Sequence, residues 1–179
     1  MTELFRELPR LEDDRIVLRP LSAGDAPALD RMRQDRLVAR YLPTFLYENR
    51  YPDIHRVMDG LYTECLAEGS LILGVYEKPD LAFCGLAELY GYRKELRKIS
   101  IGCRLAREAW GRGLAVRAVR LLAAHVTEEK QIEIITSSTL VPNKASARVL
   151  EKAGFTLVAA GADEDWGFPK PLPTNKWIL

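Results

Sequence analysis

The stretch EAWGRGLAVRAVRLLAAHV, residues 108–126, places two glycines directly before a run with helical periodicity. Apolar residues recur in that run at i, i+3, i+4, i+7 and i+11, namely Ala115, Ala118, Val119, Leu122 and Val126. This spacing gives one apolar stripe, which predicts an amphipathic helix that begins near Leu114 and packs on a sheet. Glycine usually ends a helix, so Gly111 and Gly113 need another explanation.

An anion at the start of the helix explains the glycines. The first backbone N–H groups of a helix have no intrahelical acceptor, and the macrodipole adds about half a positive charge there. Without a Cβ, Gly111 and Gly113 let these amides approach a phosphate closely, and Arg112 adds charge. The residue pattern alone leaves a plain glycine-rich turn open as the alternative.

Two common phosphate motifs do not fit the spacing. A P-loop needs a lysine followed by Ser or Thr after the second glycine, where this chain has Leu114 and Ala115. A dinucleotide fingerprint needs a third glycine where Val116 stands, and it follows the first strand of its fold rather than the fourth.

The remaining patterns predict a mixed α/β fold in the order βααβββαβαββ. The expected strands are 15–21, 70–77, 81–92, 96–105, 131–139, 154–160 and 175–179, and the expected helices are 22–35, 52–70, 114–129 and 143–153. Ser22 and Asp25 form a candidate capping box. The strand–helix–strand unit around 114–129 implies a parallel crossover, so helices cover both faces of one sheet. We expect one domain over residues 1–179.

Composition excludes several classes of protein. The net charge of +1 is spread along 179 residues, so no nucleic acid partner is expected. Cys65, Cys84 and Cys103 lack zinc-type spacing and His55 and His125 are isolated, so we expect no metal site. No apolar run is long enough to span a membrane, and no signal peptide is evident. We therefore expect a soluble, cytoplasmic protein.

Two motifs together resemble the GNAT superfamily of acetyl-CoA-dependent N-acetyltransferases, and specifically its RimJ/RimL-type branch. They are WGRGLA at 110–115 and PNKASARVLEKAGF at 142–155. Trp110, Gly113 and Ala115 occupy the positions of the superfamily's Gln/Arg-x-x-Gly-x-Gly/Ala loop, and tryptophan at the first of them is familiar in this branch. The resemblance implies a mostly antiparallel sheet of six or seven strands, with a central splay between the strands that end near Leu105 and begin near Gln131.

The resemblance also implies a site for acetyl-CoA. Its pyrophosphate would lie on the loop of Trp110, Gly111, Arg112, Gly113, Leu114 and Ala115. The pantetheine arm would lie in the splay, with an amide near Cys103 or Leu105 facing the thioester carbonyl. Asn143 would contact the arm, and Ser146 would lie near the thiol and assist the thiolate. The residues alone indicate only a helix N-cap at Asn143, a surface serine at 146 and a C-terminal glycine at 154.

The residues that the family uses for proton transfer are replaced in this chain. Ser100 and Leu150 stand where relatives often keep a glutamate and a tyrosine. Glu88 is a candidate base, acting directly or through water, and a solvated strand residue is the alternative interpretation. The acidic residues 163–165 beside Trp166 are either a further acidic candidate in a substrate-facing loop or a solvated turn. The sequence therefore predicts that chemistry depends more on Ser146 and the backbone than on any carboxylate.

Two hypotheses of function follow. The first is an N-acetyltransferase acting on a primary amine: a protein N-terminus, an amino acid or a small amine. The second is a non-catalytic acyl-CoA-binding or regulatory module. Five aromatic residues between positions 41 and 62 form either part of the core or an acceptor pocket; they are Tyr41, Phe45, Tyr47, Tyr51 and Tyr62. We expect a monomer or a homodimer, and no membrane partner.

Overall fold

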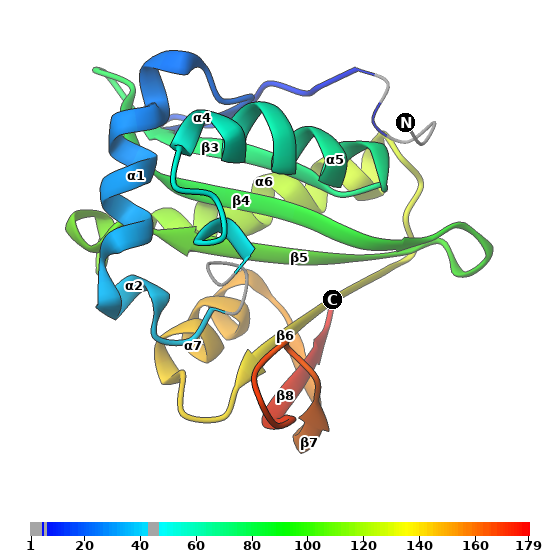
Figure 1. Ribbon diagram of the computed structural model, residues 1–179. Coiled ribbons are helices and arrows are strands. Elements are labelled where there is room, and N and C mark those ends of the chain that lie inside the picture. Colours follow the sequence, from blue (N-terminus) through cyan, green and yellow to red (C-terminus); the bar gives the residue numbers. More distant parts are fainter. Residues whose placement is uncertain (1–4, 6, 43–46) are drawn as a thin grey trace.

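A computed structural model describes residues 5, 7–42 and 47–179, and its centre is a single mixed sheet (Figure 1). The described strands form one eight-stranded sheet in the order β1-β2-β3-β4-β5-β6-β8-β7. Their bounds are β1 Leu11–Glu12, β2 Ile16–Arg19, β3 Leu71–Glu77, β4 Ala82–Arg93, β5 Lys98–Leu105, β6 Ile134–Leu140, β7 Thr156–Glu164 and β8 Leu172–Ile178. All neighbours are antiparallel except β5 and β6, so the mostly antiparallel sheet predicted from the sequence is confirmed.

The strand beyond the expected six or seven is β1. It has only two residues, which pair with Val17 and Leu18 of β2. A strand this short has no periodicity that a sequence pattern could reveal, because alternation needs about four residues.

Helices cover both faces of the sheet, as predicted (Figure 1). Their bounds are α1 Ala26–Gln34, α2 Arg36–Ala39, α4 Ile54–Arg56, α5 Tyr62–Ala67, α6 Leu114–Glu128 and α7 Lys144–Ala153. The main core lies between the sheet and α6, where Ala118, Val119, Leu122 and Val126 are buried against strand residues. Because these residues belong to the predicted apolar stripe, the orientation of α6 is set by its sequence. A smaller core on the other face packs Leu29 and Met32 of α1 against Leu86 of β4.

The helix expected over 52–70 is interrupted. A π-helical turn at Val57–Leu61 separates α4 from α5, and the Tyr62 amide donates to the carbonyl of Val57. A π turn inserts one residue per turn, which changes the side chains that face the sheet after it. Tyr62 packs against the smaller core together with Ile54 and Met58.

The sheet is splayed between β5 and β6. Their parallel pairing covers only Lys98↔Ile134, Ile99↔Ile135 and Ser100↔Thr136. On its other side β5 stays paired with β4 as far as Leu105, and β6 stays paired with β8 as far as Leu140. The splay predicted from the sequence is therefore present.

A bulge in β4 brings its backbone close to β5. Val75 pairs with Gly85 and Tyr76 with Phe83, which leaves Cys84 without a register partner. Gly85 has φ of +151°, and a Cβ on it would lie 2.2 Å from the carbonyl oxygen of Arg104. This close approach requires glycine.

Candidate functional site

The glycine loop before α6 has a left-handed backbone at both of its glycines. Gly111 (φ +74°) and Gly113 (φ +79°) are both left-handed, and Gly113 is the N-cap of α6. Nothing lies within 4 Å of the position that a Cβ would take on either glycine, so the space beside the loop is open. The Trp110 indole Nε1 donates to the carbonyl of Leu105 at 2.8 Å, which ties the start of the loop to the end of β5.

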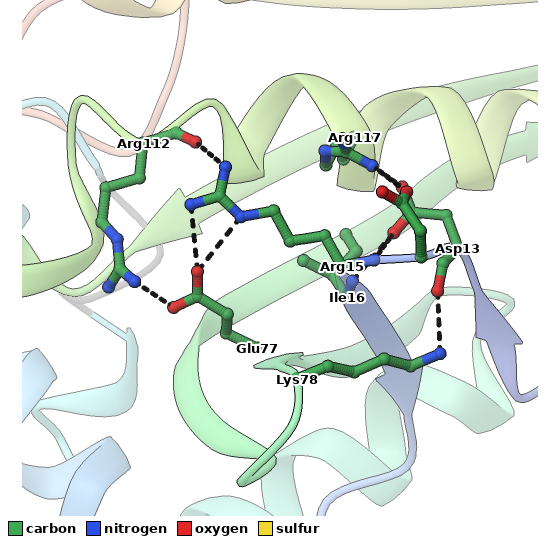
Figure 2. A network of polar contacts seen from close by, with 8 residues as sticks. Asp13, Arg15, Ile16, Glu77, Lys78, Arg112 and Arg117 are labelled. Atoms are coloured by element: carbon green, nitrogen blue, oxygen red, sulfur yellow. Dashed lines mark hydrogen bonds and ion pairs between the residues drawn. The ribbon is translucent and has the colours of Figure 1, made fainter.

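Arg112 is turned toward Glu77 at the end of β3 (Figure 2). Arg15 also pairs with Glu77, with Nη2 3.1 Å from Oε1, and its Nη1 donates to the Arg112 carbonyl at 3.1 Å. The loop is thus clamped through both the side chain and the carbonyl of Arg112. Arg15 and Arg112 share the single carboxylate of Glu77, so this group of three side chains keeps one net positive charge beside the loop.

The first turn of α6 is held in a similar way. Arg117 Nη1 lies 2.7 Å from a carboxylate oxygen of Asp13 and 2.6 Å from one of Asp14 (Figure 2 shows the Asp13 contact). A hollow of about 660 Å³ begins beside Gly113 and runs along α6. It is lined by Asp13, Gly113, Val116, Arg117, Arg120, Leu121, Ala124 and Lys152.

The splay leaves backbone groups of β5 without a strand partner. Ser137 Oγ of β6 donates to the carbonyl of Ile101 at 2.9 Å, which shows that Ile101 faces this edge. Because successive residues of a strand direct their backbone groups to opposite edges, Cys103 and Leu105 face the same opening. Ser100 Oγ and Thr136 Oγ1, 2.9 Å apart, lie at the last paired rung. The amides proposed for the thioester carbonyl are therefore at the opening.

The second motif forms the capped helix predicted for it. Asn143 Oδ1 accepts from the Ser146 amide at 3.2 Å at the start of α7, and Gly154 ends the helix with φ of +107°. The Phe155 amide donates to the Leu150 carbonyl, and both side chains are buried. Ser146 is half-buried, and it follows β6 where that strand leaves the splay.

Glu88 is not a solvated strand residue. Its side chain is 15% exposed, and its Oε1 lies 2.9 Å from Nε of Arg104 on β5. The same guanidinium pairs with Glu48, through Nη1–Oε2 at 3.1 Å and Nη2–Oε1 at 2.5 Å. Tyr62 Oη donates to Glu48 Oε1 at 2.5 Å. We call this set, Glu48, Tyr62, Glu88 and Arg104, the acidic cluster.

Burial determines the protonation behaviour of the acidic cluster. Burial raises the pKa of Glu88, and the charge of Glu48 raises it further. The charge of Arg104 lowers this pKa, but the net result is a raised pKa. Burial also acts to lower the pKa of Arg104, but Glu48 and Glu88 outweigh it and the pKa is raised. Burial, together with Glu48, raises the pKa of Tyr62 well above its usual value. A neutral phenol and a charged guanidinium follow, beside a Glu88 carboxyl whose pKa is raised.

Glu88 faces the centre of β5. Its Oε2 lies 3.7 Å from the position that a Cβ would take on Gly102, the register partner of Glu88, and Tyr90 Cε1 lies 3.4 Å from that position. The absent side chain of Gly102 leaves space between Glu88 and Tyr90. Burial and the charge of Glu88 raise the pKa of the Cys103 thiol to about 12, so that thiol stays protonated.

The acidic residues beside Trp166 have other contacts. Glu164 Oε2 lies 2.5 Å from Nζ of Lys176, and Asp165 Oδ1 accepts from the Gly167 amide at 2.8 Å. Although burial opposes it, contacts with Lys176 and Trp166 hold the pKa of Glu164 below its usual value. A carboxylate held ionised by a lysine is a weaker proton acceptor than Glu88.

The early aromatic residues that the structure describes have different contacts. Tyr62 belongs to the acidic cluster, while the Tyr41 and Tyr47 rings lie beside Arg40 and Arg50, at 5.1 and 4.8 Å. Phe45 lies outside the described residues.

Sequence reasoning missed the partners of Glu88. Arg104 and Glu48 are separated by 56 residues and carry no motif. One signal was present: Arg104 follows Ser100 and Gly102 at alternate positions, so its side chain shares their face of β5 rather than the face of Ile101 and Cys103.

The part of the chain that the structure describes holds neither a cluster of metal-ligating side chains nor a helix that could span a membrane. Its three cysteines are free thiols, and no group of three or more His, Cys, Asp or Glu side chains is placed to hold a metal ion. None of its helices has both the length and the apolar character needed to cross a membrane.

A sequence model described as the acetyltransferase (GNAT) domain matches residues 15–156. The chain is 28% identical over 109 residues to the protein named "Putative ribosomal N-acetyltransferase YdaF" from Bacillus subtilis (strain 168). This match covers 61% of the chain and spans about half, 51%, of the length of that relative.

Two solved structures have the same fold. RimL, a ribosomal L7/L12 alpha-N-protein acetyltransferase in complex with coenzyme A, aligns with a TM-score of 0.80 and 15% identity over 96% of this chain and 97% of that chain. The spermidine N-acetyltransferase from Vibrio cholerae, in complex with CoA and spermine, aligns with a TM-score of 0.76 and 17% identity over 93% and 96% of the two chains.

Proposed function

Because the chain belongs to the acetyltransferase (GNAT) family, we propose that it transfers the acetyl group of acetyl-CoA to a primary amine. The observation that carries this proposal is the splay between β5 and β6, which has the glycine loop of α6 at one end and Glu88 beside its centre. An extended pantetheine arm would add to the free edge of β5 in the manner of an extra strand.

Acetyl-CoA is held mainly by backbone groups in this proposal. The amides from Gly111 to Ala115 bind the pyrophosphate at the helix N-terminus. Trp110 and Arg112 shape the loop through their contacts with Leu105 and Glu77, and the nucleotide end lies along the hollow beside α6. Asn143 and Ser146 stand at the far side of the splay, and an amide of Cys103 or Leu105 donates to the thioester carbonyl.

Glu88 is the proton acceptor in this proposal. A primary amine is protonated at neutral pH and must lose a proton before it attacks the thioester. The two carboxylates and one guanidinium of the acidic cluster leave one net negative charge, which favours a cationic acceptor next to Gly102. The raised pKa of Glu88 also makes it a stronger base than an exposed glutamate. This reverses the order expected from the sequence, which placed Ser146 first.

A panel of amines tests the proposed function. We expect acetyl-CoA to release its thiol in the presence of at least one amino acid, polyamine or peptide N-terminus. CoA binding without thiol release across such a panel would favour the alternative of a non-catalytic acyl-CoA-binding module.

Gly113→Val is expected to weaken CoA binding by about tenfold or more, about 1.4 kcal/mol. Valine is strained at φ of +79°, and its side chain would fill the open space that a phosphate needs. Isothermal calorimetry with CoA measures the change.

Gly161→Val is the matched control for this loop. Gly161 on β7 also has a left-handed φ (+68°) and nothing within 4 Å of a Cβ, but it is outside the loop. Equal losses of CoA affinity in both variants would contradict a phosphate site at Gly113.

Ser146→Ala is expected to lower kcat by about tenfold with little change in CoA affinity. The Ser146 amide, and not its hydroxyl, donates to Asn143 Oδ1, so the helix cap survives when the hydroxyl is removed. Steady-state kinetics with an accepting amine measure kcat, and calorimetry measures CoA binding. A loss of CoA affinity equal to the loss of kcat would assign Ser146 to binding rather than to the thiolate.

A further inference from the structure

The acidic cluster joins three parts of the chain that are distant in sequence. Arg104 lies on β5 and Glu88 on β4, while Glu48 lies in the segment between α2 and α4. The side chains of Arg104 and Glu48 are 3% and 2% exposed. Ion pairs this deeply buried are weak evidence for stability, because the desolvation of the two charges offsets most of their attraction.

The guanidinium is divided between the two carboxylates. Its Nη1 and Nη2 both contact Glu48, a two-point contact that fixes the plane of the guanidinium. Its Nε is left for Glu88 Oε1. With Oε1 held in this way, Oε2 is the oxygen that faces Gly102.

The segment that carries Glu48 is itself anchored from α1. Arg33 donates to the backbone carbonyls of Glu48, Tyr51 and Pro52, at 3.2, 2.7 and 3.0 Å. Asp30 pairs with Nε of Arg33 at 2.6 Å. Glu48 therefore reaches Arg104 from a fixed backbone.

We infer that Glu48 and Arg104 are positioning residues of the reaction: Glu48 orients the Arg104 guanidinium, which holds Glu88 with one carboxylate oxygen directed at the acceptor amine over Gly102. The inference rests on the proposed function, and it adds two residues that touch neither acetyl-CoA nor the amine. In each turnover Glu88 takes a proton from the ammonium and releases it to solvent, while Arg104 and Glu48 keep their charges.

The groups that face Glu88 set its titration. The charged groups are Arg104 on β5 and Glu48. The titratable side chains of Tyr90 on β4 and of Tyr62 and Cys65 on α5 also lie on this side of the sheet. Arg104 alone among them is a cation, and Glu48 is the carboxylate that competes with Glu88 for it.

This arrangement predicts opposite effects for two variants. In Glu48→Gln the guanidinium interacts with one carboxylate only, so the pKa of Glu88 falls and the acid limb of kcat/KM moves to lower pH. In the double variant Glu48→Gln/Arg104→Gln the cation is lost as well, so the pKa and the acid limb move above those of wild type. The double variant removes the Glu48 carboxylate together with the Arg104 cation, so Glu48 is not left buried without its partner, which favours folding.

The test follows the carboxyl carbon of Glu88 by NMR titration in the full-length chain, with Glu88→Gln identifying the signal. Kinetics with an accepting amine are measured in parallel. We expect kcat to fall about tenfold in Glu48→Gln, with an unchanged KM for acetyl-CoA.

Asp25→Asn is a matched control. Asp25 is also a buried carboxylate that contacts one arginine and one tyrosine hydroxyl, Arg19 at 3.4 Å and Tyr76 at 2.8 Å, but it lies near the start of α1. Its loss should lower stability and leave the titration of Glu88 unchanged.

The inference would be overturned if the pKa of Glu88 moved in the same direction in Glu48→Gln and in Glu48→Gln/Arg104→Gln, or if it moved in neither. Equal effects of Asp25→Asn and Glu48→Gln on the pH profile would overturn it as well, because they would indicate a purely structural role. A wild-type protein that acetylates no amine would refute the proposed function instead, and the titration would still decide whether Arg104 and Glu48 control Glu88.

Discussion

Glu88→Gln should lower kcat for acetylation about 10³-fold while leaving CoA affinity near that of wild type. Glutamine keeps the shape of the side chain, and its amide oxygen can still accept from Arg104, but it cannot take a proton from the ammonium. The loss should therefore appear in the chemical step.

The pH dependence supplies a second measurement of the same variant. A base works only when deprotonated, so wild-type kcat/KM should fall as the pH drops through the pKa of Glu88, which burial raises above the ordinary glutamate value. This acid limb should be absent in Glu88→Gln.

A surface glutamate provides the control. Glu133 is 61% exposed and pairs with Arg97 at 2.7 Å, so Glu133→Gln removes a paired carboxylate outside the acidic cluster. Near-normal kcat in Glu88→Gln, combined with a large loss in Ser146→Ala, would support the order expected from the sequence alone.

Gly85→Ala should lower the free energy of unfolding by about 3 kcal/mol, from the combined cost of overpacking and of an unfavourable φ. The added Cβ would lie 2.2 Å from the Arg104 carbonyl oxygen and 2.7 Å from the Leu105 Cα, both of which are backbone atoms and cannot rotate away. Urea denaturation with one probe of the sheet and one of the helices measures the change.

Gly60→Ala makes the same substitution where space is available. Gly60 lies in the π-helical turn, and nothing is within 4 Å of the position of its Cβ. Alanine there should be neutral or slightly stabilising. Equal denaturation midpoints for Gly85→Ala and wild type would mean that β4 and β5 can separate at the bulge without cost.

The sequence predicted the elements whose signals are local. The apolar stripe defined α6, the Asn143 cap and Gly154 defined α7, and the glycine pair marked the loop between β5 and α6. The splay was predicted because two motifs resembled a known family, since nothing in the strand residues themselves indicates where pairing stops.

Features that depend on distant residues were not predictable. The contact between Arg112 and Glu77 was not predicted, because Glu77 is remote in the chain and charge alone does not indicate which way an arginine turns. Glu88 was named as a candidate base, but its burial was not predicted, because the burial of a strand face depends on what packs over it. Here a segment anchored by Arg33 brings Glu48 against Arg104.

The three hydrogen bonds from Arg33 to residues 48–52 affect how new specificities could arise. All three of its contacts are to main-chain oxygens, and every amino acid supplies such an oxygen. Side chains in this segment can therefore be exchanged without releasing its backbone. A laboratory library could vary the other side chains of this segment while keeping Arg33, Asp30 and Glu48, and be screened for acetylation of new amines. Acceptor specificity can therefore change in a segment whose backbone position does not depend on its side chains.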